Sequence, residues 1–169
     1  MRVITIGAEE YTLNLNMSAL RRLDILRPGQ DMARLTALME TTVGLLDLAQ
    51  VASGKDREKL AENLLRHLDV VAVLKRAILE EIAESMRSEL AKGKENGVVD
   101  LTLEELKINE KDGGLSYRRL VSLGLASGLT LADMPPLSPG MVCDLFLYRQ
   151  MYDDQQHGIK RKQPKVYDA

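Results

Sequence analysis

Tryptophan is absent from this chain, and phenylalanine and cysteine each occur once. Because aromatic residues make up only 4% of the sequence, the core has to be built from aliphatic side chains and methionine, which favours helices over a β-sandwich. A single cysteine, Cys143, excludes an intrachain disulfide and a multi-cysteine zinc site. This cysteine usage fits a reducing compartment such as the cytoplasm.

Long apolar runs are also missing. No run approaches the roughly 20 residues that a membrane-spanning helix needs, and the opening MRVITIGAEEY lacks the apolar core of a signal peptide. A formal net charge of −2 provides no general attraction to nucleic acid or to an acidic membrane. We therefore expect an intracellular protein with no membrane partner and without nucleic acid as its main partner.

The 169 residues are enough for one ordinary domain, or for one domain with a small appendage. The apolar fraction of 45% and the charged fraction of 28% are typical of a folded protein rather than a disordered one.

Two short alternating runs open the chain, Arg2–Ile6 and Tyr11–Leu15, and Gly7–Glu10 lies between them. This pattern predicts a β-hairpin with Tyr11, Leu13 and Leu15 on its buried face. Since an isolated hairpin is marginally stable in water, helices must cover that face.

Helical spacing follows the hairpin. We expect a helix over Met17–Leu26, and then a helix capped by Asp31 that is weakened, and could break, at Thr41 to Gly44. The segment Asp56–Leu90 gives the strongest helical signal, with a heptad-like seam of large side chains. The seam residues are Leu60, Leu64, His67, Val71, Leu74 and Ile78.

Within that segment, residues 68–74 are apolar on nearly every side, which predicts packing from two directions. Asp69 marks a point where the helix could end, so one helix and two helices both stay open. We expect a solvent-exposed helix face with ion pairs to neighbouring basic residues at Glu80, Glu81 and Glu84.

Glycine and polar clusters divide the remaining chain. The cluster at 92–97 indicates a turn, Thr102 and Glu105 form a capping-box pattern, and Asn109–Gly114 is the clearest linker. We therefore predict a core domain over 1–108, a linker over 109–114, a C-terminal helical unit over 115–157 and a disordered basic tail over 158–169.

Proline organises the C-terminal unit. Pro135 and Pro136 cannot continue a helix, whereas Ser138 and Pro139 form a helix start with a capping hydroxyl and a proline at the first helical position. The spacing of Val142, Leu145, Phe146, Arg149 and Tyr152 then predicts one helical face. The predicted fold is mainly α, with an N-terminal β-hairpin, a helical bundle and a C-terminal helix-connector-helix unit.

Residues that could perform chemistry are few and scattered. We expect His67 in a helix interface and Cys143 in the core, and the pair Asp153 and His157 lacks the third ligand that a metal site needs. No phosphate loop, dinucleotide fingerprint or serine elbow is present. The sequence thus predicts no catalytic residue, no cofactor and no metal, and it indicates an interaction protein rather than an enzyme.

Two stretches resemble tail assembly chaperones of long-tailed bacteriophages of the siphovirus type. The opening ITIGAEEYTLNLNMSALRRLD is similar to the family's hairpin and following helix of the form Ala-Leu-x-x-Leu. The stretch LGLASGLTLADMPPLSPGMVCDLFLYRQMY resembles its small C-terminal region, with Gly128-Leu129 as the turn, Ser138-Pro139 as the helix start and Tyr148-Arg149 as the aromatic-Arg pair. Together they cover less than half of the chain.

The resemblance implies a non-enzymatic chaperone that works in the host cytoplasm during virion morphogenesis. Such proteins hold the helical tape-measure protein soluble, help to recruit tail-tube protein and leave before the virion is complete. We expect a homo-oligomer, and a partner-binding surface in which methionines adapt to apolar helices. The candidate partner-binding residues are Met134, Met141, Val142, Leu145, Phe146, Tyr148, Arg149 and Tyr152.

One alternative belongs to a different class. The C-terminal helices and the basic tail, with Lys160, Arg161, Lys162 and Lys165, could serve a small DNA-associated regulatory protein. Pro135-Pro136 follows the glycine turn too early for an ordinary helix-turn-helix, which weighs against this alternative.

Overall fold

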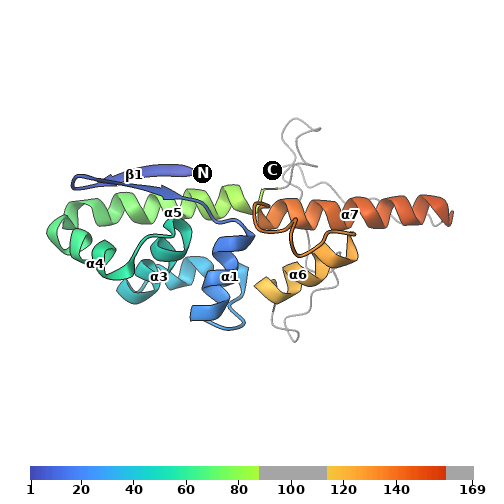
Figure 1. Ribbon diagram of the computed structural model, residues 1–169, viewed down its shortest axis with the longest axis horizontal. Helices are drawn as coiled ribbons and strands as arrows, with labels where there is room; N and C mark the ends of the chain where they lie inside the picture. Colours follow the sequence, from blue (N-terminus) through green and yellow to red (C-terminus); the bar gives the residue numbers. More distant parts are fainter. Residues whose placement is uncertain (88–113, 159–169) are drawn as a thin grey trace.

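The computed structural model describes residues 1–87 and 114–158 and consists mainly of helices, with one two-stranded hairpin at the start. The fold class predicted from the sequence is thereby confirmed, including the helix-connector-helix arrangement at the C-terminal side (Figure 1). The elements are β1 Arg2–Ile6, β2 Glu9–Leu13, α1 Met17–Leu26, η1 Met32–Arg34, α2 Leu35–Leu38, α3 Thr42–Ser53, α4 Arg57–Arg66, η2 Leu68–Val70, α5 Val71–Ser85, α6 Tyr117–Ala126 and α7 Pro139–Gln156.

The hairpin pairs β1 and β2 in antiparallel register, with Ile4 opposite Tyr11. Tyr11, Leu13 and Leu15 are all buried, as the alternation predicted. The second strand ends at Leu13 instead of Leu15, because Leu13 pairs with Arg2, the first residue of β1. The amide of Leu15 donates instead to the buried carboxylate of Glu81 on α5, at 3.1 Å. The Tyr11 hydroxyl accepts from the Asn63 amide group at 2.7 Å, and this bond ties the hairpin to α4.

The helix predicted after Asp31 is divided. Thr41 is the N-cap of α3 and its hydroxyl accepts from the Gly44 amide, so the weak point noted in the sequence is a helix start. Asp31 lies directly before the 3-10 helix η1. Its carboxylate accepts from the Leu115 amide at 3.1 Å, and the Met32 amide donates to the Leu115 carbonyl, so this stretch also fastens the C-terminal unit.

The segment from Asp56 onward is two helices, α4 and α5, separated at His67 by a short 3-10 turn. The seam residues Leu60, Leu64, Leu74 and Ile78 are buried. The prediction that residues 68–74 pack from two directions is wrong, because Leu68 and Val73 are exposed to solvent. Glu80 and Glu84 form the expected ion pairs with Arg76 and Arg87, but Glu81 is buried and holds β2 and the chain start.

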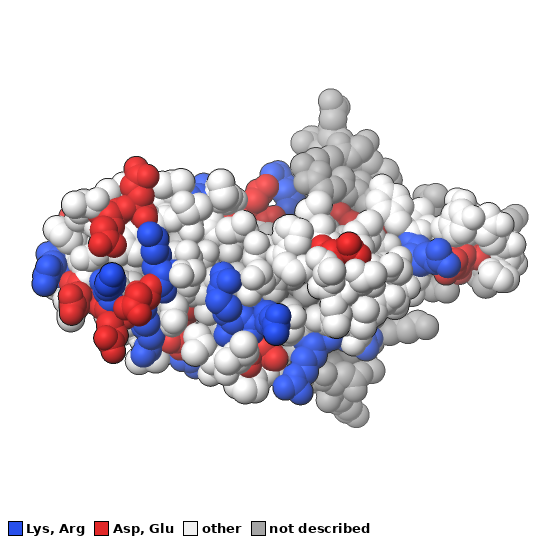
Figure 2. Space-filling view, in the orientation of Figure 1, with Lys and Arg blue, Asp and Glu red and all other residues white. Residues whose placement is uncertain are grey.

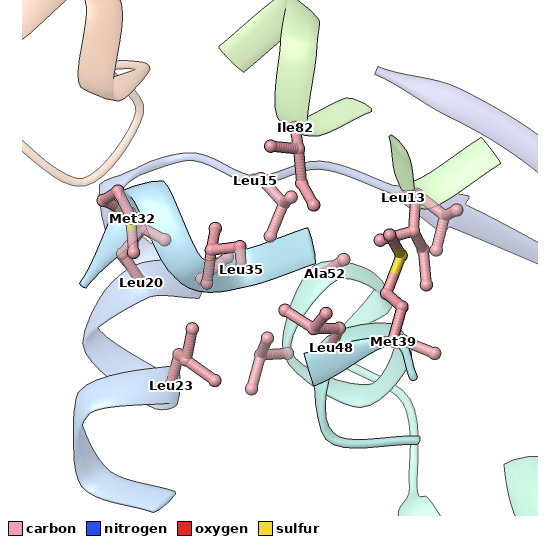
Figure 3. Packing of buried hydrophobic residues seen from close by; sticks show 14 of the residues in the cluster. Leu13, Leu15, Leu20, Leu23, Met32, Leu35, Met39, Leu48, Ala52 and Ile82 are labelled. Atoms are coloured by element: carbon pink, nitrogen blue, oxygen red, sulfur yellow. The ribbon is translucent and has the colours of Figure 1, made fainter. Parts of the chain in front are cut away.

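One continuous core joins the hairpin, the central helices and the C-terminal unit. Figure 3 shows part of it, where Leu13 and Leu15 meet side chains of α1, α3 and α5. Leu115, Leu120, Leu123, Met134, Val142 and Cys143 belong to the same cluster of buried residues. The C-terminal unit is therefore packed against the rest of the described chain rather than separated from it.

Several predictions concern residues that the structure does not describe. The turn at 92–97, the capping box at Thr102, nearly all of the linker over 109–114 and the basic tail beyond Gly158 lie outside the described residues. The predicted domain boundaries and the disorder of the tail stay predictions.

A bridging carboxylate fastens three helices near the core. Asp47 on α3 is buried and accepts from Arg27, just after α1, at 2.7 Å, and it lies 3.1 Å from the guanidinium of Arg57 on α4. The two ion pairs with arginines offset the cost of removing the Asp47 carboxylate from water.

Asp47→Asn keeps the side-chain shape and removes the charge that both arginines bind. We expect the free energy of unfolding to fall by about 1 to 3 kcal/mol, because the guanidinium groups lose their anion. Urea unfolding followed by circular dichroism measures the loss. Glu62→Gln is the matched control, since Glu62 pairs with Arg66 at 3.9 Å on the open surface and should change little. Equal stability of the two variants would contradict the bridging role.

Candidate protein-binding surface on α7

Local capping signals define the two helices of the C-terminal unit. The Ser116 hydroxyl accepts from the Arg119 amide at the start of α6, and the Ser138 hydroxyl accepts from the Met141 amide at the start of α7. Pro139 occupies the first turn of α7, where its missing amide costs no hydrogen bond. Both starts lie where the sequence predicted the C-terminal helix-connector-helix unit.

The connector between the helices is fastened to α1 through the backbone. The Met17 amide donates to the Leu137 carbonyl at 2.8 Å, and the Ser18 amide donates to the Pro135 carbonyl at 3.2 Å. The next amide, of Ala19, donates to the Asn16 side chain. The amides of the first three helical residues of α1, which have no partner within the helix, are thus satisfied, two of them by the connector.

The connector itself is held by a turn. The Thr130 amide and hydroxyl both donate to the Asp133 carboxylate, at 2.9 and 2.6 Å, and these bonds lower the pKa of Asp133. Together with the two prolines, this turn limits the conformations that the connector can adopt.

Two glycines allow the helices to approach closely. A Cβ on Gly140 would clash with the backbone carbonyl of Arg87, just after α5, and a Cβ on Gly124 would lie 2.6 Å from the end of the Met134 side chain. The sequence predicted no packing role for either glycine, because no local pattern shows which residues the folded chain places against them.

Gly140→Ala tests this approach through the sign of its effect. Alanine is favoured over glycine in a helix by about 1 kcal/mol, so the variant would be stabilised if its methyl group had space. Because the Arg87 backbone occupies that space, we expect a loss of about 1 to 3 kcal/mol in the free energy of unfolding. Met141→Ala, one position on and exposed, is the control. A stabilised Gly140→Ala protein would refute the close contact between α5 and α7.

The structure divides the candidate partner-binding residues into two groups. Met134 and Val142 are 3% and 0% exposed and belong to the core, and Phe146 is half-buried against it. A partner cannot reach the first two in the folded chain. Val142 and Leu145 therefore do not share one exposed face, and the single face predicted for α7 has to be corrected, because α6 covers the Val142 side.

The remaining apolar candidates form a strip on the outer side of α7. Met141, Leu145, Tyr148 and Tyr152 are 42%, 38%, 55% and 55% exposed. Their spacing of four, three and four places them along one side of the helix over about 16 Å. We call these four residues the α7 strip. Phe146, which faces the core, is rotated from the middle of the strip by about 130°, so α7 is apolar on two opposed sides.

The distal half of α7 extends beyond the other labelled helices (Figure 1). Charged side chains gather over the end of the molecule that carries α4 and are sparse over α7 (Figure 2). An apolar strip with few charges on a projecting helix is the composition expected of a protein-binding surface.

Arg149 borders the α7 strip. Its guanidinium lies 3.2 Å from the Asp153 carboxylate and 5.9 Å from the centre of the Tyr152 ring. These contacts hold Arg149 along the helix beside the strip. The His157 ring contacts the Asp153 carbonyl at 2.7 Å, so Asp153 and His157 bond within the helix end and do not converge on an open position.

Cys143 is fully buried between α7 and the core, as predicted. Burial raises the pKa of its thiol to about 12, and the neighbouring Asp144 carboxylate adds to the rise. A thiol in this state is neither a nucleophile nor a metal ligand at neutral pH.

The buried thiol makes stability depend on alkaline pH. Since the pKa of an unfolded cysteine is near 9, the unfolded chain loses this proton first, and stability falls from about pH 9 up to pH 12. The loss is about 1.4 kcal/mol per pH unit. Urea unfolding at a series of pH values should therefore show the stability difference between the wild type and Cys143→Ala shrinking above pH 9. A difference that stays constant with pH would contradict the shift.

Other places offer little for chemistry. A shallow depression of about 280 Å³ between the hairpin turn and the start of α4 is lined by both signs of charge, including Glu9, Lys55 and Lys59. Within residues 1–87 and 114–158, no group of three or more histidine, cysteine or acidic side chains is arranged to hold a metal ion. In the same residues no helix is long and apolar enough to cross a membrane.

Comparison of the chain with protein families, with curated proteins and with solved structures found no match. The α7 strip is therefore the feature from which function has to be argued.

Proposed function

We propose that this protein is a non-enzymatic tail assembly chaperone of a long-tailed bacteriophage. It binds apolar helices of the tape-measure protein in the host cytoplasm, keeps them soluble and helps to recruit tail-tube protein around them. The observation that carries the proposal is the α7 strip, an apolar row on the solvent side of a helix whose other side is already packed.

Helix pairing explains how such a strip would hold its partner. Residues spaced by four, three and four are one side of a two-helix seam, and they fit a partner helix with apolar residues at the same spacing. Before the tail tube encloses it, a tape-measure protein exposes long apolar helical stripes, which the α7 strip would cover. Two tyrosines give large contact area at a low entropic cost, and the methionine adapts its shape to the partner.

The position of the strip also supports this role. The connector, fastened to α1, and Gly140, in contact with the end of α5, fix the first turns of α7, while its distal half projects from the molecule (Figure 1). A long partner can therefore lie along α7 without displacing the core.

The test is co-expression with the tape-measure protein from the same genome. The wild type should keep that protein soluble and co-purify with it. Leu145→Glu/Tyr148→Glu places two carboxylates in the middle of the α7 strip, and we expect at least a tenfold drop in soluble partner, since a charge buried in an apolar contact costs several kcal/mol.

The matched control is Leu65→Glu/Leu68→Glu. These leucines are 73% and 68% exposed at the far end of the molecule, and the same change there should leave co-purification intact. Circular dichroism must show that both variants fold. If a folded wild type leaves the partner insoluble, the chaperone assignment fails. If both variants lose the partner equally, the α7 strip is not its binding surface.

If the chaperone assignment fails, DNA binding is the next function to test, through its steep dependence on salt concentration. The C-terminal helices do not favour it, because Arg149 on α7 is paired with Asp153 and Arg118 on α6 is paired with Asp24.

A further inference from the structure

The α7 strip has a symmetry that its role as a binding surface for another protein does not require. The spacing of four, three and four is the same when it is followed from either end of the helix. Two copies of α7 laid antiparallel would therefore place Met141 against Tyr152 and Leu145 against Tyr148, and then repeat both contacts across a two-fold axis. A surface that matches itself in this way is suited to an isologous dimer.

We propose that, when no client is bound, the α7 strips of two copies of this chain pair antiparallel and cover each other. The second copy acts as a removable cover of the client-binding surface. The identity of the client rests on the proposed function, but the pairing itself depends only on this chain.

Charge favours the antiparallel arrangement. A parallel pair would bring Arg149 level with Arg149 of the second copy, whereas the antiparallel register separates the two arginines along the seam, the second one lying level with position 144. Because Arg149 and Asp153 already neutralise each other at 3.2 Å within the helix, no like charges meet across the seam.

The shape of the chain favours it as well. The core lies at the first turns of α7, where Gly140 contacts the end of α5, and the distal half of the helix projects away from it (Figure 1). Antiparallel pairing puts the two cores at opposite ends of the helix pair. Parallel pairing would bring both cores to the same end, beside each other.

The size of the strip sets the strength of the pairing. Four side chains over about 16 Å form a small interface, so we expect a micromolar dissociation constant rather than a permanent dimer. Such a weak cover can be displaced by a client with longer apolar stripes.

The experiment is sedimentation equilibrium of the full chain alone, over roughly 1 to 300 μM. The wild type should change from monomer to dimer within this range. Leu145→Glu should raise the dissociation constant at least 30-fold, as loss of a central contact does, while the exposed-surface control Leu65→Glu should not change it. A wild type that stays monomeric at 300 μM, or a dimer that Leu145→Glu leaves intact, would overturn the proposal.

Disulfide trapping tests the direction of the helices. When Met141→Cys and Tyr152→Cys proteins are mixed and oxidised, antiparallel pairing predicts that the mixed dimer dominates. Dominant Met141→Cys homodimers would indicate parallel helices and contradict the proposal. Cys143 does not interfere, since it is fully buried and the pKa of its thiol is about 12.

These measurements are independent of the client. Self-pairing can fail while the tape-measure protein still co-purifies, and the client assay can fail while the dimer forms, so either conclusion can be rejected without the other.

Discussion

Two backbone hydrogen bonds determine where the C-terminal unit lies. The carbonyls of Pro135 and Leu137 accept from the first two amides of α1, groups that a helix cannot satisfy for itself. If the connector moved away, α1 would begin with unpaired amides next to the buried Met17. The start of α1 and the placement of α7 are therefore coupled. The bonds between the stretch at Asp31 and the backbone at Leu115 add a second attachment on the other side of α6.

This attachment leaves α7 with an apolar row on its solvent side. A helix that packs through one side usually presents polar residues on the other. In α7 the solvent side carries the α7 strip instead, and its distal half projects beyond the other labelled helices (Figure 1). An apolar row held on a rigid, projecting helix loses little conformational freedom when a second helix covers it, which favours binding. The proposed client and the proposed second copy would both use this property.

The contrast with the opposite end of the molecule is informative. Leu65 and Leu68 are even more exposed than the α7 strip, but they lie at a helix corner, where charged side chains gather over the same end of the molecule (Figure 2). Single exposed leucines are common on protein surfaces and need no partner. What distinguishes the α7 strip is its regular spacing along one helix.

The sequence by itself determined the local elements. Alternation gave the hairpin and its buried face, serine and proline gave the start of α7, and the glycine-containing weak point at Thr41 became a helix start. It also marked residues 134–152 as the region that contains the candidate partner-binding residues. These features depend on the conformational preferences of residues that are neighbours in the chain, so the local sequence is enough to predict them.

Only the tertiary structure decided which sides of the helices are free. Val142 and Leu145 are equally apolar in the sequence, yet one lies in the core and the other faces solvent, because α6 covers one side of α7. On α5, Glu81 is buried where it binds the Leu15 amide, while Glu80 and Glu84 form ion pairs on the surface. The Asp31 carboxylate binds a backbone amide 84 positions away. Contacts between residues distant in the chain set all of these outcomes, and no local pattern encodes them.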